Sequence, residues 1–138
     1  MITCFTVPIS VIKRLSSMII DGKQLSAKLK EQMAEQVVEL KAKYGRVPSL
    51  AVILVGENPA SQSYVRGKIK ACEVCGFESI LITLPERVSE SDLLAEIAKL
   101  NDDEKVDGVL VQLPLPKHID EEKVIDAIAL EKDVDGFH

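Results

Sequence analysis

The chain has 138 residues, which fits one domain and is long enough to form a hydrophobic core. Hydrophobic residues make up 46% of it and charged residues 28%, an ordinary composition for a globular domain. The formal net charge is −5, with Lys and Arg scattered among acids, so we expect no nucleic-acid partner. No apolar run approaches the length of a membrane span, so we expect no membrane partner either.

The first 17 residues differ in composition from the rest. They contain no acid, carry Lys13 and Arg14, and are rich in Ser, Thr and β-branched residues. This is typical of a weak organelle-targeting segment. A tag or a misassigned start is the preferred interpretation, because Met18 opens a well-patterned sequence. The expected location is the cytoplasm, or the mitochondrion if residues 1–17 are a targeting segment.

Apolar patterning predicts alternating helices and strands along the remainder. Apolar residues at helical spacing predict helices over about 23–44, 60–75, 89–100 and 119–130. Continuous apolar runs predict strands over about 50–55, 79–84 and 106–112. The tail from Lys132 to His138 is expected to have no element of its own.

Local signals support several of these boundaries. Gly45 supplies a stop for the first helix. Asn58, followed by a proline, fits an N-cap with proline in the first helical turn. Ser89 or Ser91 is expected to cap the third helix, and Ser89 with Asp92 resembles a capping box in which Asp replaces Glu.

The cysteines are Cys4, Cys72 and Cys75, an odd and low count that indicates a reducing compartment without a disulfide framework. Cys72 and Cys75 form a C-x-x-C pair near the end of a helix that Gly76 should stop, whereas redox function needs the first Cys at a helix N-terminus. A zinc site needs two more ligands, and the sequence has no second Cys or His pair. We expect both to be buried as small apolar residues.

The order of elements predicts an α/β fold. The expected architecture is a three-layer αβα domain whose mainly parallel sheet, of three or more strands, is flanked by helices. Right-handed crossovers should link the strands. Ligands of open α/β sheets bind outside the carboxyl ends of the strands. At that edge the sequence places residues 56–68, 85–88 and 112–118.

Tyr64 and Lys68 are the first candidate pair for chemistry. They are four residues apart, about one helical turn, so their side chains lie on the same face of the predicted helix. A lysine beside a tyrosine in a partly dry cleft can transfer protons near neutral pH. The alternative is that Lys68, like Lys70, is a solvated helix lysine, and spacing alone favours that alternative.

Gln112 and the two tail aspartates are the other candidates. Gln112 ends an apolar strand, where a buried amide would have to bind a ligand or position an amine; otherwise it caps the strand in solvent. Asp133 and Asp135 flank Val134 beside a turn signal. One carboxylate can accept two N–H bonds from a planar edge such as that of a pterin. The alternative is a solvated acidic tail.

Other residue types point to no further site. His118 and His138 lack partners at metal-binding spacing, so we expect no metal. Gly56 stands alone, so the chain has neither a G-x-G-x-x-G motif nor a P-loop. Pro114 and Pro116 stiffen the loop after the third strand, which suits a pocket wall or simply ends the strand.

Three long motifs occur in one order and at compatible spacing. They are residues 56–68 (GENPASQSYVRGK), 106–116 (VDGVLVQLPLP) and 132–138 (KDVDGFH), preceded by IDGK at 20–23. Together they resemble the signatures of bifunctional methylenetetrahydrofolate dehydrogenase/methenyltetrahydrofolate cyclohydrolase. The resemblance implies a role in one-carbon metabolism that serves purine biosynthesis. The implied reactions are NADP-dependent oxidation of 5,10-methylenetetrahydrofolate and hydrolysis of the methenyl product to 10-formyltetrahydrofolate.

The resemblance also implies roles for the matched residues. Lys68 matches the family's catalytic lysine, and Tyr64 matches the tyrosine that lies by the folate and supports it. Gln112 matches the glutamine that hydrogen-bonds the lysine and tunes its protonation, and Asp135 matches the aspartate that binds the pterin ring. Cleft-lining and folate-contacting positions are matched by Ser61, Val111, Leu113 and Pro114.

The family has a second, nicotinamide-binding Rossmann domain after the Asp-Gly-Phe motif, and this chain stops at His138. We therefore expect residues 18–138 to be the catalytic domain, with tetrahydrofolate derivatives as ligands. NADP is expected to bind only the intact enzyme, with no cofactor-binding residue in this chain. The resemblance implies a homodimer for the intact enzyme and leaves the state of this chain open.

Three interpretations stay open at the level of sequence. The isolated chain is either half of a working enzyme or a folate-binding module without turnover. A flavodoxin-like or receiver-like regulatory domain with chance similarity is the third possibility, and it predicts no folate binding.

Overall fold

The computed structural model describes residues 21–137. The expectations for residues 1–17, Cys4 and His138 lie outside the described residues. The elements in chain order are α1 (Gly22–Tyr44), β1 (Ser49–Val55), α2 (Pro59–Cys75), β2 (Glu78–Leu84), α3 (Glu90–Asp102), β3 (Gly108–Val111), α4 (Glu121–Asp126) and the 3-10 helix η2 (Leu130–Lys132).

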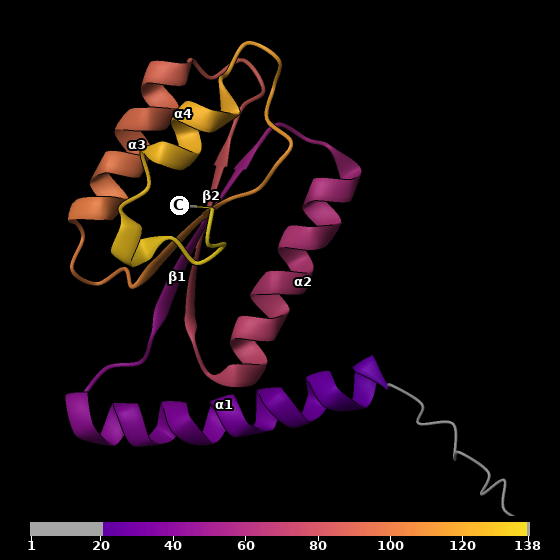
Figure 1. Cartoon of the computed structure of the whole chain (residues 1–138), viewed down its shortest axis with the longest axis vertical. Coiled ribbons are helices and arrows are strands. Elements are labelled where there is room, and N and C mark those ends of the chain that lie inside the picture. The colour runs from indigo at the N-terminus through magenta and orange to yellow at the C-terminus, as the bar shows by residue number, and fades with distance from the viewer. Residues whose placement is uncertain (1–20, 138) are drawn as a thin grey trace, which may run out of the picture.

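The sheet confirms the predicted fold class. Within the described residues it has the order β2-β1-β3, and β1 pairs in parallel with both neighbours. Figure 1 shows α2 on one side of the strands, α3 and α4 on the other, and α1 across the end where the strands begin. The carboxyl ends of the strands therefore meet at the end opposite α1.

The central strand β1 divides the core into two layers. Ile53 and Val55 pack on the side of α3 and α4, whereas Val52 and Leu54 pack on the side of α2. This alternation is the period-two geometry of a strand. Strand β2 has no fully buried residue, but its Ile82 and Leu84 are partly buried and pack against the core on the α3 side.

The predicted helix boundaries are confirmed at three caps. The side-chain oxygen of Asn58 accepts the backbone N–H groups of Ala60 and Ser61 at 2.9 and 3.2 Å, and a proline occupies the first turn of α2. Ser89 accepts the backbone N–H of the third residue after it at 3.1 Å. Gly45 ends α1 with a φ of 74°, a conformation that favours glycine.

The prediction of one helix over residues 119–130 is wrong. The helix is the shorter α4, which begins where the carboxylate of Asp120 accepts the first backbone N–H groups. Its predicted end is interrupted because Asn101 binds the backbone there, donating to the C=O of Ala127 at 2.8 Å and accepting from the N–H of Ala129 at 3.0 Å. Those groups are then no longer available for helical pairing.

The tail from Lys132 has no helix or strand of its own among its described residues, apart from Lys132 itself, but contacts with other elements hold it in place. Lys132 belongs to η2, and Asp133 forms an isolated parallel bridge with Val109 of β3. The last described residues thus lie alongside the third strand. They are placed by contacts with it and with the end of α3.

Helix α1 forms as predicted but buries little of its apolar face. Val37 is its buried residue, whereas Leu25, Leu29 and Met33 are 54%, 42% and 42% exposed. A groove of about 430 Å³ runs between these side chains and α2. No helix in the described part of the chain is long and apolar enough to cross a membrane.

Candidate functional site

Helix α2 presents one face to the sheet and the other to solvent. Ser61 and Val65 are each 2% exposed, and Val65 packs with Leu110 of β3. Lys68 is half-buried, one turn beyond Val65, whereas Lys70 is exposed. Lys68 therefore lies on the flank of the helix that turns toward the sheet and is partly shielded from water.

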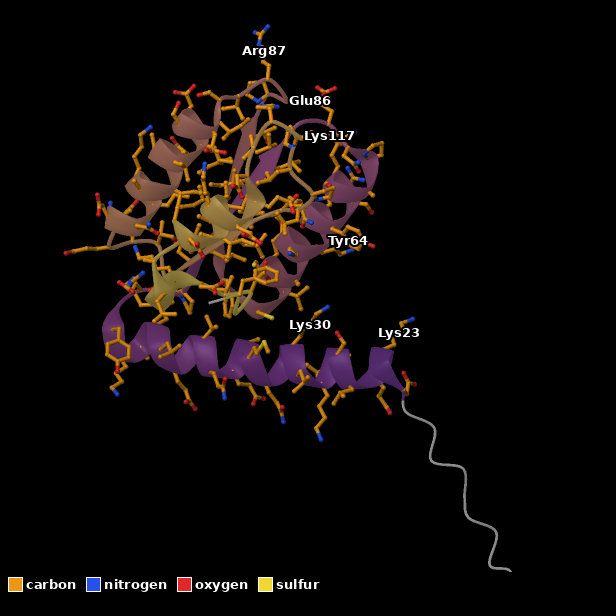
Figure 2. The ribbon with its side chains drawn as sticks, turned by 45° about the horizontal axis from the view of Figure 1, so that its top comes forward. Lys23, Lys30, Tyr64, Glu86, Arg87 and Lys117 are labelled. Carbon is orange, nitrogen blue, oxygen red and sulfur yellow. The ribbon has the colours of Figure 1, made fainter. Side chains whose placement is uncertain are left out.

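Tyr64 lies on the outer flank of the same helix. Its side chain is 67% exposed and projects from α2 (Figure 2). It precedes Lys68 by one turn, as the spacing predicts, but no hydrogen bond joins the phenol and the amine among the described contacts. The pair thus borders the shielded strip without forming a bonded dyad.

Gln112 follows β3 on the face that α2 covers. Leu110 packs against α2, and strand alternation places Gln112 on the same side, one step nearer the carboxyl edge. Its backbone N–H donates to the carbonyl of Ile53 at 2.9 Å, and its side-chain N–H donates to the carbonyl of Leu113 at 2.7 Å. Within the described chain its Oε1 is buried without a hydrogen-bond partner.

An unpaired buried acceptor is unfavourable, by about 1–3 kcal/mol in typical cases. The position of Gln112 Oε1 is therefore suited to an N–H or N⁺–H donor that arrives from the α2 side. Lys68 is the ammonium-bearing, half-buried residue on the sheet-facing flank of α2. The two side chains therefore belong to the same side of the sheet, without a hydrogen bond between them in the described residues.

The loop after Gln112 is fixed by a hydrogen bond to α4. The Leu113–Pro114 peptide bond is cis, and the backbone N–H of Leu115 donates to a Glu121 carboxylate oxygen at 2.7 Å. Leu113 packs against the core on the α3 side, and Pro114 is exposed. Val111 is buried in that same core, so the structure places it on the opposite face of the sheet from Ser61.

A hollow of about 380 Å³ lies at the carboxyl edge. Its walls are the turn after β1 and the loop after Gln112, with Glu86 between them. Figure 2 shows Glu86 and Lys117 at this end of the molecule. The segments expected at the ligand edge therefore do come together there.

The structure gives the two tail aspartates different roles. One carboxylate oxygen of Asp133 accepts the backbone N–H groups of Asp135 and Gly136 at 3.1 and 3.0 Å, which closes a tight turn. Asp135 is exposed, and its carboxylate makes no hydrogen bond or ion pair within the described residues. Asp133 thus shapes the turn, and Asp135 presents an accessible carboxylate.

The cysteine pair is buried, as predicted. Cys72 and Cys75 are free thiols in the last turn of α2, and burial, followed by the neighbouring Cys75, raises the pKa of Cys72. A raised pKa keeps a thiol protonated and unreactive. No group of three or more potential metal-ligating side chains occurs in residues 21–137.

Sequence reasoning missed the side chains that support the site from a distance. Glu121 binds the loop after Gln112, and Lys132 and Asn101 bind the segment that leads to Asp135. One local signal was available, because an Asp three residues before a Gly is typical of the turn that Asp133 makes. The other contacts join residues 6 to 32 positions apart, which no local pattern reveals.

Comparison with known proteins decides the family. The model of the tetrahydrofolate dehydrogenase/cyclohydrolase catalytic domain matches residues 20–135. The chain belongs to this family. A curated relative, the bifunctional protein FolD of Burkholderia lata, is 60% identical over 124 residues, which cover 90% of this chain and 43% of the relative.

Solved structures agree with the family assignment. The bifunctional enzyme FolD of Campylobacter jejuni is 54% identical with a TM-score of 0.84, over 86% of this chain and 42% of that one. The FolD enzyme of Trypanosoma brucei, solved with NADP and an inhibitor, is 39% identical with a TM-score of 0.81, over 83% of this chain and 39% of that one. The chain thus spans about two fifths of the length of these relatives.

Proposed function

We propose that this chain is the folate-binding, catalytic part of a bifunctional enzyme of one-carbon metabolism. Such an enzyme oxidises 5,10-methylenetetrahydrofolate with NADP and hydrolyses the methenyl product to 10-formyltetrahydrofolate. The observation that carries the proposal is the buried Gln112 oxygen, which has no partner in the described residues and lies on the face of the sheet covered by α2, the helix that carries the half-buried Lys68. The family match and the relatives named bifunctional FolD support it.

In the proposed hydrolysis, water adds to the methenyl carbon and the bridging C–N bond opens. Lys68 removes a proton from the attacking water and returns one to the departing ring nitrogen. Gln112 Oε1 accepts a hydrogen bond from the lysine and so fixes its direction. Tyr64 lies beside the folate, Asp135 accepts two N–H bonds from the pterin edge, and the cleft is completed by Ser61, Leu113 and Pro114; Val111 is left out because it is buried in the core on the α3 side.

NADP does not fit the residues described here. Within residues 21–137, one turn from a strand to a helix contains a glycine of positive φ, which is Gly56 (φ 77°). The next residue in that turn is Glu57. Glu86 also lines the hollow at this turn. Carboxylates at the start of α2 would repel a diphosphate. We therefore derive no step through NADP from this chain.

A binding module without turnover is the second candidate. The exposure of Tyr64, at 67%, and of Asp135 favours it, because both face open solvent rather than a closed cleft. A water-excluding site strengthens the electrostatic effects on which proton transfer depends. The two candidates share the folate site and differ only in turnover.

Calorimetry with 5-formyltetrahydrofolate, together with an assay of methenyltetrahydrofolate hydrolysis, separates these candidates. Lys68→Met should abolish hydrolysis and keep most of the folate affinity, because the amine is needed for proton transfer. The matched control is Lys70→Met, which removes an exposed lysine from the same helix and should leave both unchanged. Hydrolysis that survives in Lys68→Met would overturn the catalytic assignment, and a parent chain that binds no folate would overturn both candidates.

A further inference from the structure

Helix α3 ends without the usual glycine. Its C-cap residue, Asp103, has an extended backbone (φ −80°, ψ 107°), so the last carbonyl groups cannot be satisfied by a left-handed turn. The ammonium group of Lys132 binds these carbonyl groups instead. It donates to the carbonyl oxygens of Leu100, Asn101 and Asp103 at 2.9, 2.7 and 2.8 Å. Three donors meet three acceptors, and the positive charge lies at the negative end of the helix dipole.

The contacts of Lys132 fix the backbone that leads directly to Asp135. Figure 1 shows this yellow segment passing the end of α3. Asn101 binds the start of the same segment, accepting from the N–H of Ala129 and donating to the C=O of Ala127. Asp133, the next residue after Lys132, then accepts the N–H groups of Asp135 and Gly136. The chain of contacts therefore runs without a gap from the end of α3 to the exposed carboxylate.

Strand β3 supports the turn from its other side. A Cβ atom added to Gly108 would lie 2.5 Å from Cγ1 of Val134, which is closer than real Cβ contacts allow. Glycine at this position lets Val134, and with it the neighbouring Asp135, lie close against the start of β3. The turn is thus confined between the end of α3 and β3.

We infer that Lys132 is a positioning residue for substrate binding, which acts through Asp135. The inference rests on the proposed function, in which Asp135 binds the pterin edge. Two parallel hydrogen bonds accepted by one carboxylate tolerate little displacement, so a shift of about 1 Å in the turn weakens both of them. Lys132 itself lies on the α3 side of the turn and does not contact the ligand.

The first test follows the turn without any ligand. Amide hydrogen exchange is compared in the full chain, in Lys132→Met and in Lys99→Met. Lys99 is the matched control, because it also lies at the end of α3 but pairs only with Glu96 of the same helix, at 2.7 Å. Exchange at Asp135 and Gly136 should rise in Lys132→Met, with the amides of β1 unchanged, and should stay at the parent level in the control. Unchanged exchange in the turn would overturn the inference.

The second test separates positioning from a general structural role. Binding of 5-formyltetrahydrofolate is measured for the parent, Lys132→Met, Asp135→Ala and the double variant. If Lys132 acts through Asp135, Lys132→Met weakens binding about tenfold in the parent and adds less than about twofold to Asp135→Ala. An equal loss in both backgrounds would overturn the inference. If Lys132→Met does not fold, the same binding measurements are made on Lys132→Gln, which keeps two N–H donors. The outcomes that support or overturn the inference are then the same.

The two tests also separate failure of the inference from failure of the proposed function. A parent chain that binds no folate, with faster exchange in the turn of Lys132→Met, would overturn the proposed function and support the positioning of the turn by Lys132. Normal binding that Asp135→Ala abolishes but Lys132→Met does not change would overturn only the inference.

Discussion

The two sides of the sheet differ in how fully their polar groups are hydrogen-bonded. On the α3 side, residues 127–136 are held by the side chains of Asn101, Lys132 and Asp133, each of which makes two or more hydrogen bonds to backbone groups. On the α2 side, Gln112 Oε1 is buried without a partner in the described chain, and Tyr64 projects into solvent. The α3 side, which would orient a ligand, is therefore already fixed by hydrogen bonds. The α2 side, which would carry out the chemistry, keeps a buried acceptor without a hydrogen-bond partner in the described chain.

This difference has a physical reason. A residue that orients a ligand works best when its backbone is already fixed, because less conformational entropy is lost on binding. A residue that transfers protons must keep its bonding capacity for the substrate, at some loss of stability in the free protein. Variants on the two sides should therefore change stability in opposite directions.

The largest effect is expected from Asn101→Ala. This change leaves the C=O of Ala127 and the N–H of Ala129 without their Asn101 partner in a partly buried place, so the free energy of unfolding should fall by about 2 kcal/mol. Urea denaturation measures the loss. The matched control is Asp102→Ala, which alters the exposed neighbour on α3 and should change stability by less than about 0.5 kcal/mol. Equal effects of the two variants would remove the basis for a preformed α3 side.

Gly108→Ala should follow, with a loss of about 1–2 kcal/mol. The added methyl group overlaps Cγ1 of Val134, and a crowded core site typically loses that much. A second substitution, Val134→Ala, removes the overlapping atom and should restore most of the stability lost by Gly108→Ala. If the double variant were instead as unstable as the sum of the two changes, contact with Val134 would not be the cause.

Gln112→Leu should act in the opposite direction. Replacing the amide removes a buried unpaired oxygen, so the free energy of unfolding should rise by up to about 1 kcal/mol. Methenyltetrahydrofolate hydrolysis should be lost in the same variant. Thermal unfolding and the hydrolysis assay, with the exposed Gln36→Leu as control, measure the two effects. A clear loss of stability in Gln112→Leu would show that the α2 side is as well satisfied as the α3 side.

The smallest expected effect is a pH dependence at the start of α3. The backbone N–H of Asp120, and secondarily Lys123, lowers the pKa of the Glu90 carboxyl below its ordinary 4.5. Because the folded pKa is the lower one, the contribution of Glu90 to stability is present above about pH 4.5 and is lost as the pH falls through the folded pKa. The urea midpoints of the parent and Glu90→Gln should therefore differ at pH 7 and converge in acid. A difference that grew in acid would contradict this sign.

Local sequence signals predicted the parts of the fold that depend on neighbours in the chain. The strand β1, the Asn58 and Ser89 caps and the Gly45 stop were all predicted, since each rests on residues within one turn or strand. The end of α4 was not predicted, because it is set by Asn101, 28 residues before Ala129. The edge position of β2 likewise depends on which strands pair, and its apolar sequence carries no sign of it.

The same limit applies to the candidate site. Motif spacing selected Lys68, Gln112 and Asp135, and the structure places Gln112 just beyond the carboxyl end of β3, whereas Asp135 follows the segment that lies against the start of that strand. Spacing gave no indication of the unpaired Gln112 oxygen or of the three carbonyl groups that surround Lys132. Those features follow from packing between elements that are distant in sequence.

The apolar face of α1 has a practical consequence for work with the isolated chain. Leu25, Leu29 and Met33 border a groove of about 430 Å³ while the helix is fully formed. Dyes such as ANS fluoresce when they bind exposed apolar surface, and this signal is commonly used to diagnose partly folded states. For this protein the native fold itself offers such a surface. The chain has no Trp, and Tyr44 and Tyr64 are exposed, so near-ultraviolet circular dichroism gives little signal for fixed packing. Protection of the β1 amides from hydrogen exchange is therefore the better indicator of whether a sample or variant is folded.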